Sequence, residues 1–458
     1  MKTRKNSIVC LLLIAAMIAS MLVGCADKAE NTPELDANAT NDSTDTANGT
    51  DTTDDQQNDP AELPDLSELV DNIDPATGLV TDIENYGSNT VTALSAYSIT
   101  EAVPNDSNMS AVVAVTEKGE VCLTNAQLQI YYWMEFYNFM NSYGSYASML
   151  GLDTTQPLYL QASMQEGSTW EQYFLEAAAK HYNENYALAQ AAYENGYVIS
   201  EEEEANIADM NDPDGTFAAE ATEYGYESVD AYVQANFGPG ITVEDYQEYL
   251  RTYYAASYYY TSQKEAYVAT LTEADVEAHF DENIENFDGL TKVNNIKVRH
   301  ILIGVEGETD ENGEYSAEAW AAAEATANEI YEQWKTDPTE DNFIELAKTH
   351  STDPGSKDNG GLYDDVYPGQ MVEAFNDWCF EESRQVGDHD IVKTNYGYHI
   401  MYFVGQSENR QWYTAAEEDI VAVTMNALLD EIIEQYPLLF DYNKVRIYDM
   451  VTASTVAE

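Results

Sequence analysis

Two histidines stand inside apolar runs that read as strands, where a buried imidazole needs a partner. His300 lies in the run 296–303 and His399 in the run 397–403. Side chains alternate between the two faces of a strand, so each histidine has apolar neighbours on its own face. These neighbours are Val298 and Leu302 for His300, and Met401 and Phe403 for His399. If the two strands are adjacent, the imidazoles can meet in the floor of one sheet and exchange hydrogen bonds.

Three other interpretations concern the histidines and cysteines of the chain. A histidine in a strand can be a core residue whose hydrogen bonds are satisfied locally. His350 and His389 could act as metal ligands together with Asp353, Asp388 or Asp390, but their spacing fits no metal-binding template. The absence of a Cys-x-x-Cys motif excludes a thiol oxidoreductase. We therefore expect no metal and no cofactor.

The elements around the two histidines follow one another in a distinctive order. A strand containing Val298-Arg-His-Ile-Leu-Ile303 comes first, and a helix follows it. The loop His350-Ser-Thr-Asp-Pro-Gly-Ser-Lys-Asp-Asn-Gly-Gly361 and the segment Pro368-Gly-Gln-Met-Val-Glu-Ala-Phe375 come next, and Val392-Lys-Thr-Asn-Tyr-Gly-Tyr-His-Ile400 closes the run. This order resembles a parvulin-type peptidyl-prolyl isomerase domain over residues 294–406. The resemblance implies a small antiparallel sheet flanked by helices.

The resemblance also implies a role for particular residues. His300 and His399 match the central histidine pair of the family, Thr394 matches its hydroxyl partner, and Asp353 matches a position that the family fills with Asp or Cys. Met371 and Phe375 match residues that line the proline pocket. The chain departs from the family after Gly361, where Tyr363 replaces the usual pocket leucine and Val366 the usual phenylalanine. Tyr363 is expected to form part of the pocket wall with a changed fit.

Prolyl isomerisation needs no nucleophile, metal or cofactor. The barrier to rotation about a peptide bond is about 18–20 kcal/mol, and X-Pro bonds interconvert over tens to hundreds of seconds. A site accelerates rotation if it favours the twisted amide over both planar forms. Hydrogen-bonding groups near the rotating carbonyl can do this. The sequence leaves open whether the histidines act directly or organise a scaffold.

The chain begins with the features of an exported lipoprotein. Residues 1–25 combine a basic start with an apolar stretch and end in Leu-Val-Gly-Cys25, which resembles a bacterial lipobox. Lipidation of Cys25, with palmitate among the expected acyl chains, would anchor the protein to the outer face of a membrane. The alternative is a membrane-spanning segment, but the apolar run is short for that. Residues 26–88, rich in Asp, Asn and Thr, predict a disordered acidic tether.

The rest of the sequence is mostly helical in pattern. Residues 89–293 predict a helical module rich in tyrosine, whose rings either fill the core between helices or grip unfolded segments. Residues 407–458 predict a helix and a strand that pack back on that module. The fold class is therefore α+β, with the parvulin-type domain inserted in a chaperone-like module. Foldase lipoproteins of the PrsA kind and periplasmic chaperones of the SurA kind resemble this plan.

The charge limits the choice of partners. With 83 acidic and 19 basic residues, the formal net charge is -64, which disfavours nucleic acid. The first hypothesis is a lipid-anchored foldase at the extracytoplasmic face of the cell membrane, which isomerises X-Pro bonds in newly exported, unfolded polypeptides. The second keeps the chaperone module and treats the parvulin-type domain as a catalytically weak client-binding platform. A solute-binding or adhesive lipoprotein does not account for residues 294–403. Homodimerisation stays open.

Overall fold

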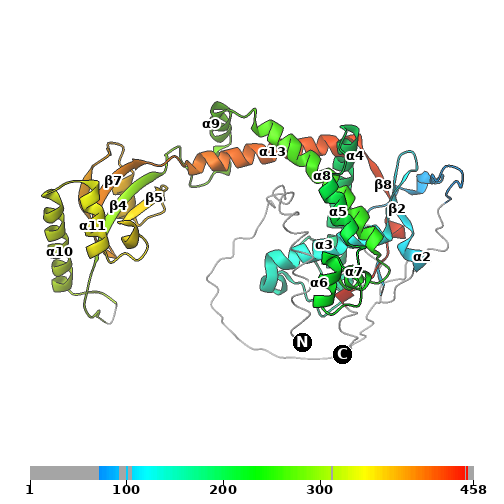
Figure 1. Cartoon of the computed structure of the whole chain (residues 1–458), viewed down its shortest axis with the longest axis horizontal. Coiled ribbons are helices and arrows are strands. Elements are labelled where there is room, and N and C mark those ends of the chain that lie inside the picture. Colours follow the sequence, from blue (N-terminus) through cyan, green and yellow to red (C-terminus); the bar gives the residue numbers. More distant parts are fainter. Residues whose placement is uncertain (1–71, 92–98, 102–105, 311–312, 449, 452–458) are drawn as a thin grey trace, which may run out of the picture. The chain divides into compact units, whose positions relative to one another are not determined.

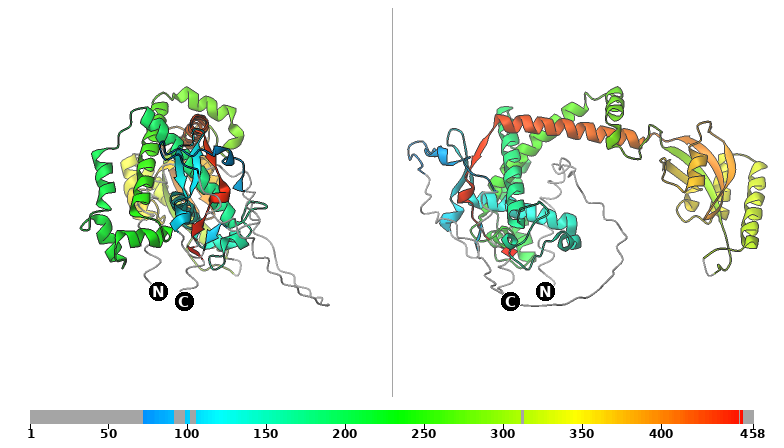
Figure 2. Two further views of the ribbon diagram at one scale, coloured as in Figure 1. Left: turned by 90° about the vertical axis from the view of Figure 1, so that its right-hand side faces the viewer. Right: turned by 180° about the vertical axis from the view of Figure 1, so that it is seen from behind.

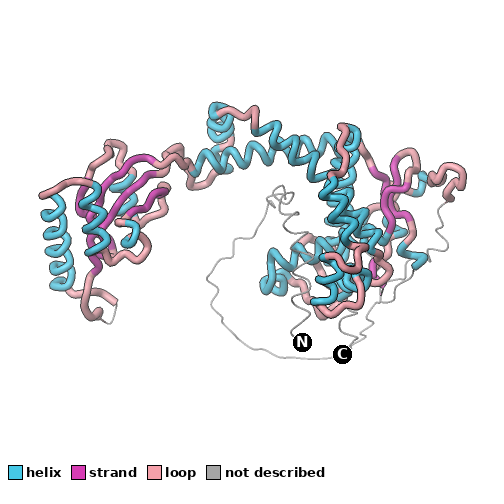
Figure 3. The backbone as a smooth tube through the Cα atoms, in the orientation of Figure 1, coloured by secondary structure: helices cyan, strands magenta, loops and turns pink. Residues whose placement is uncertain are grey.

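The structure is a computed structural model that describes residues 72–91, 99–101, 106–310, 313–448 and 450–451. The described residues from 267 to 423 form one compact unit, and those up to 266 and from 424 onward form the other. The second unit is thus an insertion in the sequence of the first (Figure 1). The expected fold class, α+β with helices predominating, is confirmed (Figure 3). The expected signal segment, with Cys25, lies outside the described residues.

The first unit is built from helices, with short strands from both of its chain segments. Antiparallel pairing joins the strands in the order β3-β2-β8, and β1 pairs with β9 in parallel. The strands are β1 Thr100–Glu101, β2 Val112–Thr116, β3 Val121–Thr124, β8 Leu438–Phe440 and β9 Ile447–Tyr448. The helices are α2 Asp106–Met109, α3 Asn125–Tyr143, α4 Trp170–Glu194, α5 Glu201–Asp209, α6 Thr216–Glu223, α7 Val229–Phe237 and α8 Val243–Val268.

Local sequence signals fix where several of these helices begin. Thr124 accepts a hydrogen bond from the Gln127 amide, and the Gln127 side chain accepts one from the Thr124 amide. Thr169 forms the same reciprocal capping box with Gln172 at the start of α4. Each box satisfies amide groups that a helix leaves unpaired at its first turn. The helices α3 and α4 thus begin directly after Thr124 and Thr169, in the region expected to be helical.

Residues 72–88 differ from the expected disordered tether. Val80 is 2% exposed and Tyr86 4%, and both pack in one apolar cluster with Val112 and Val115 of β2. The Tyr86 hydroxyl also donates a hydrogen bond to the carbonyl of Val112. Burial of these side chains stabilises an ordered path that the Asp- and Thr-rich composition did not suggest.

The aromatic residues of the first unit mostly form its core. Phe139 of α3 contacts Phe174 of α4 edge to face, with ring centroids 5.8 Å apart. Most of the tyrosines in α3, α4, α7 and α8 are buried in this way, which favours the core interpretation for them. The buried tyrosines are Tyr131, Tyr132, Tyr137, Tyr182, Tyr232, Tyr246, Tyr249, Tyr253 and Tyr260. Tyr143, Tyr146, Tyr193 and Tyr258 are exposed.

The second unit contains a four-stranded antiparallel sheet in the order β5-β4-β7-β6. The long strands β4 and β7 run side by side in its middle (Figures 1 and 2). The strands are β4 Ile296–Gly304, β5 Leu362–Val366, β6 His389–Thr394 and β7 Gly397–Gln406. The helices are α9 Glu273–Glu282, α10 Ala317–Lys335, α11 Glu340–His350, α12 Glu373–Cys379 and the first part of α13 Gln411–Gln435.

Each face of this sheet has its own apolar core. Ile301 and Ile400 lie on the face covered by α10 and α11, where they pack with Trp334 and Phe343. The opposite face is covered by α12 and contains Ile296, Val298, Val366, Phe375, Trp378, Cys379, Val392, Met401 and Phe403. The second face is the one that also carries the two strand histidines, because His300 and His399 alternate with Ile301 and Ile400.

A further small cluster extends the second unit beyond the sheet. Val276 and Phe280 of α9 pack with Trp412 and Ala416 at the start of α13. The compact unit is therefore longer at both ends than the expected domain 294–406. Within the described residues, none of the helices combines the length and the apolarity that a membrane crossing requires.

Candidate active site

The register of β4 and β7 brings the two histidines together. Leu302 lies opposite His399 and Met401 lies opposite His300, so the histidines are diagonal neighbours on one face. Their rings are stacked, with centroids 5.2 Å apart and planes inclined by 19°. The Nδ1 atoms are 3.0 Å apart, and both side chains are buried. The expected meeting of the two imidazoles in the sheet floor is what the structure contains.

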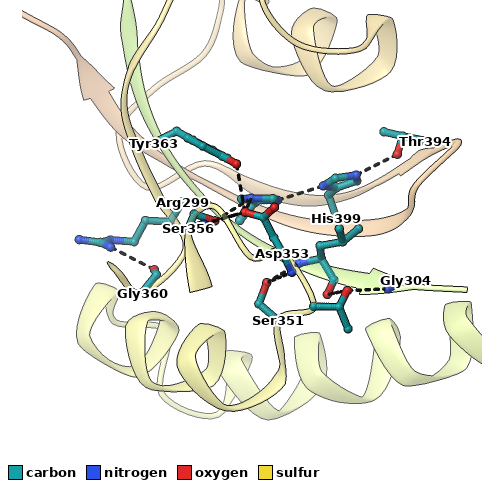
Figure 4. Close-up of polar contacts among 12 residues, drawn as sticks. Arg299, Gly304, Ser351, Asp353, Ser356, Gly360, Tyr363, Thr394 and His399 are labelled. Atoms are coloured by element: carbon teal, nitrogen blue, oxygen red, sulfur yellow. Dashed lines mark hydrogen bonds and ion pairs between the residues drawn. The ribbon is translucent and has the colours of Figure 1, made fainter. Parts of the chain in front are cut away.

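Asp353 lies against Nε2 of His300. Ser356 and Tyr363 approach the same carboxylate (Figure 4). Asp353 Oδ2 lies 3.1 Å from His300 Nε2. The same oxygen accepts hydrogen bonds from the Ser356 amide at 2.9 Å, from the Ser356 hydroxyl, and from the Tyr363 hydroxyl at 3.1 Å. Hydrogen bonding to His300 first, then to Ser356 and Tyr363, keeps the pKa of Asp353 well below its usual range against the effect of burial. The carboxylate is therefore ionised at neutral pH and can only accept hydrogen bonds.

Thr394 completes the other end of this row of contacts (Figure 4). Its Oγ1 lies 2.8 Å from His399 Nε2 and accepts a hydrogen bond from the Tyr396 amide. If Thr394 donates to His399, then His399 Nδ1–H donates to His300 Nδ1 and His300 Nε2–H donates to Asp353. If His300 carries a second proton, the contacts from His300 to Thr394 reverse, while the contact with Asp353 stays. In both arrangements Asp353 fixes the orientation of His300.

Burial sets the charge of the inner histidine. Burial first, and the neighbouring His300 second, lower the pKa of His399 to about 3. His399 is thus neutral at pH 7 and must use one ring nitrogen as donor and the other as acceptor. A neutral imidazole beside Asp353-bound His300 gives the site an oriented row of donors and acceptors.

The loop that carries Asp353 is fastened to the end of β4. The Ser351 hydroxyl accepts hydrogen bonds from the amides of Leu302 and Asp353, both at 3.2 Å. The Thr352 amide donates to the Leu302 carbonyl at 2.8 Å. Thr352 Oγ1 also accepts a hydrogen bond from the Gly304 amide. These contacts hold the loop beside the histidine pair instead of leaving it mobile over the sheet.

Gly361 lets the end of this loop pair closely with β4. Its φ is +76°, and its carbonyl accepts a hydrogen bond from the His300 amide at 2.8 Å. A Cβ at this position would lie 2.2 Å from the carbonyl oxygen of His300. Both the positive φ and the close approach require glycine. Gly361 therefore positions β5, and with it Tyr363, against the histidine strand.

Aromatic and apolar side chains surround the polar row. Phe375 of α12 meets both histidine rings edge to face, with centroids 5.4 Å from His300 and 5.3 Å from His399. Met371 is partly buried against the same cluster, and Val366 is buried within it. The expected pocket residues Met371 and Phe375 thus lie beside the expected polar residues, as the apolar half of one site.

Tyr363 makes contacts beyond its expected place in the pocket wall. Its ring stacks on His300 at a centroid distance of 5.3 Å and an angle of 27°, while its hydroxyl donates to Asp353. Burial first, and the Asp353 carboxylate second, raise the pKa of Tyr363 to about 12. The phenol therefore stays protonated and serves as a hydrogen-bond donor. A leucine at this position could make neither the ring-stacking contact with His300 nor the hydrogen bond to Asp353.

Ser356 and Ser351 are site residues that sequence reasoning missed. Ser356 Oγ lies 3.0 Å from His300 Nε2 as well as against Asp353, and the side chain is 1% exposed. The spacing Asp353-Pro-Gly-Ser356 was a usable signal, because an Asp side chain often accepts from residues two or three further on in a turn. The hydroxyl of Ser351 had no comparable signal, since its partners depend on the pairing of the loop with β4.

The remaining candidate ligands are dispersed. His389 contacts Tyr331 and Trp334 on the α10 side of the sheet, away from Asp353. Across the described ranges, no group of three or more His, Cys, Asp or Glu side chains is arranged to hold a metal ion. Cys379 is buried in the α12 cluster, and burial raises the pKa of its thiol to about 12, so it is not a thiolate at neutral pH.

Comparison with known proteins agrees with this geometry. Residues 284–406 match the family model of the PPIC-type PPIase domain. A foldase protein PrsA 1 from Listeria innocua is 36% identical over 114 residues, which are 25% of this chain and 32% of the relative. A foldase protein PrsA from Geobacillus is 43% identical over 96 residues, 21% of this chain and 33% of the relative. The aligned part thus spans about a third of the length of these relatives.

A solved structure gives a similar but weaker match. The crystal structure of a peptidylprolyl isomerase, PrsA, from Bacillus anthracis is 20% identical to this chain, with a TM-score of 0.20. The match covers 57% of this chain and 97% of the Bacillus chain. The family model and the relatives confirm the resemblance drawn from the histidine strands and the Asp353 loop. This chain contains a PPIC-type, that is parvulin-type, PPIase domain.

Proposed function

We propose that the chain is a foldase that catalyses cis-trans isomerisation of X-Pro bonds in unfolded polypeptides. One observation carries the proposal: the row Asp353–His300–His399–Thr394 lies directly against the aromatic ring of Phe375. Polar groups that can meet a rotating amide and an apolar surface that can hold a proline ring are thus adjacent. The match of residues 284–406 to the PPIC-type domain supports the same activity.

The proposed mechanism needs only positioning and hydrogen bonding. Met371 and Phe375 would hold the proline ring, while the carbonyl of the preceding residue turns near the polar row. The twisted amide has lost its resonance, so its nitrogen is a better acceptor and its carbonyl is no longer conjugated. Donors that meet the twisted form better than either planar form lower the barrier. The neutral state of His399 and the ionised state of Asp353 keep the row in place, and a donor of the row would leave its present partner to meet the twisted amide.

The proposal extends to location and clients. Lipidation at Cys25 would tether the protein to the extracytoplasmic face of the cell membrane, where newly exported chains are unfolded. The helical first unit would bind such chains, and the acidic surface would favour basic segments of them. These parts rest on the sequence of residues 1–25 and on the charge of -64.

A second candidate function is client binding with weak catalysis. Tyr363, in place of the family leucine, occupies the face of His300 and one lone pair of Asp353. If this contact restrains His300 too strongly, the domain would bind X-Pro segments without accelerating their rotation. The domain would then be a client-binding platform in a chaperone.

A refolding assay separates the two candidates. The substrate is a small protein whose slow refolding phase is limited by one X-Pro bond, which relaxes over tens to hundreds of seconds. The foldase proposal expects the full chain, in catalytic amounts, to shorten this phase, and expects Met371→Ala to lose the effect. Met164→Ala, an exposed methionine of the first unit, is the matched control. An unchanged slow phase, with the unfolded protein bound, would favour the platform.

A further inference from the structure

The first unit contains a cavity of about 200 Å³ at the junction of β3, α3, α4 and α8. Pockets for drug-sized ligands usually measure about 300–1,000 Å³, so this volume suits a single long side chain better than a cofactor. Five tyrosines and one carboxylate define its wall, namely Tyr131, Tyr182, Tyr186, Tyr193, Tyr249 and Glu248. In the part of the chain that the structure describes, no Lys, Arg or His lines it.

The tyrosine rings form a continuous aromatic wall. Tyr131 of α3 meets Tyr182 of α4 and Tyr249 of α8 edge to face, with centroid distances of 5.3 and 5.1 Å. Tyr182 in turn stacks on Tyr186 at 6.1 Å. The faces of aromatic rings carry partial negative charge and attract cations held within about 6 Å. A wall of this kind favours a cationic side chain over an anionic one.

Carboxylates around the cavity also favour a cationic side chain. Burial first, then the neighbouring Tyr131, Cys122 and Tyr186, and least the charge of Glu248 raise the pKa of Tyr182. Burial and, more weakly, Glu120 and Glu135 raise the pKa values of Tyr186 and Tyr249. These phenols therefore stay neutral and lie in a negative potential. That potential would be relieved by an entering positive charge.

The bases close to the cavity already have acidic partners. Arg251 lies 3.3 Å from Glu204 and 3.9 Å from Glu248, and its closer contact is with Glu204. His181, which meets Tyr131 edge to face, is paired with Glu135 at 2.7 Å. The Glu248 side chain is 56% exposed, and within the described residues its one ion pair is the long contact with Arg251, so it can take up a new cation at the cavity rim.

A buried phenol with one imperfect partner lies on the cavity wall. Hydrogen bonding with the Asn185 amide lowers the pKa of Tyr131 against the larger opposite effect of burial, so the two buried groups are partners, although their geometry is not ideal. Tyr131 is only 2% exposed. Buried polar groups normally have partners, and leaving one unpaired costs stability. An entering N–H donor that reached the Tyr131 hydroxyl would give it a second partner.

We propose that this cavity binds the side chain of an arginine or lysine carried on an unfolded polypeptide. The aliphatic stem would lie along the tyrosine rings, and the cationic head would meet Glu248 and the phenol oxygens. The site would give the helical unit a preference for basic segments that is independent of proline. The inference rests on the client binding proposed above for this unit, and it does not depend on isomerase activity.

The test uses the full chain and proline-free peptides. Fluorescent Gly/Ser peptides carry one central Arg, Lys or citrulline, the last being a neutral isostere of arginine, and anisotropy gives the dissociation constants. We expect the Arg peptide to bind roughly ten-fold more tightly than the citrulline peptide, which corresponds to about 1.4 kcal/mol. Glu248→Gln should remove most of this preference. Glu244→Gln, one turn away on α8 and outside the cavity, should leave it unchanged.

A second pair of variants tests the aromatic wall. Tyr193→Leu removes an exposed ring of the cavity, so folding should be unaffected, and it should weaken Arg-peptide binding about three-fold. Tyr146→Leu, at an exposed tyrosine elsewhere in the unit, is the control and should have no effect. Equal losses in the two variants would overturn the assignment of the wall.

Three further outcomes would overturn the inference. Equal affinities for the Arg and citrulline peptides would rule out a cation site. N-acetyl-arginine amide binding as tightly as the Arg peptide would show a small-molecule site in place of a polypeptide site. If no peptide binds at all, client binding by the helical unit fails as well. Loss of the slow-phase acceleration in Met371→Ala would still report separately on the isomerase domain.

Discussion

Replacing Asp353 with Asn tests the polar row at its anchor. The carboxylate oxygen Oδ2 receives donors from His300, Ser356 and Tyr363, and an amide oxygen keeps the shape but not the charge. Hydrogen bonds to a charged group contribute about 1.5–3 kcal/mol each, and the other donors would still have a weaker acceptor. We therefore expect Asp353→Asn to lower the unfolding free energy of the domain by about 2 kcal/mol.

Hydrogen exchange of the full chain measures this loss locally. Mass spectrometry of peptides from β4 reports the opening of the domain, and about 2 kcal/mol corresponds to roughly 30-fold faster exchange. Asp358→Asn, at an exposed position of the same loop, is the matched control and should leave exchange unchanged. Because hydrogen bonding lowers the pKa of Asp353 in the folded state, its contribution is present above about pH 4 and is lost as the pH falls further. Equal exchange in the wild type and Asp353→Asn at pH 7 would refute the anchoring role.

Three further predictions concern neighbouring residues. Because the pKa of His399 falls from 6.5 to about 3 on burial, unfolding takes up a proton between these values, so the domain should lose stability as the pH falls from about 7. Imidazole NMR should show a neutral ring at pH 5, and a midpoint near 6.5 would contradict this. Gly361→Ala should lower the unfolding free energy by more than about 2 kcal/mol, measured by hydrogen exchange of β4 peptides. Gly369→Ala, whose added Cβ meets nothing within 4 Å, should lower it by about 1 kcal/mol. Tyr363→Phe keeps the stacked ring but loses the donor to Asp353, so it should cost about 1 kcal/mol, and no loss would show that the contact is dispensable.

The strand histidines illustrate what the sequence could predict. Alternation placed His300 and His399 on inward faces, and the family resemblance supplied the pairing of their strands. The structure brings Asp353, Thr394, Met371 and Phe375 to the same face. Their catalytic and substrate-binding roles stay predictions until activity is measured.

Contacts that depend on the pairing of distant segments were harder to predict from the sequence. The double role of Tyr363 requires the register of β5 against β4 and the close approach at Gly361. Composition gave the wrong prediction for residues 72–88, because Val80 and Tyr86 of this polar segment pack on β2. Helix starts were predictable, since a capping box such as that of Thr124 is local in sequence.

The central claim is that the site beneath Phe375 accelerates rotation about X-Pro bonds. Exchange NMR on short peptides with one X-Pro bond measures this rotation directly, with the full chain added in catalytic amounts. The account predicts cis-trans exchange that rises in proportion to the chain concentration and is largely lost in Met371→Ala, while β4 stays protected from hydrogen exchange. A folded wild-type chain that accelerates exchange of no peptide in the panel would contradict the claim.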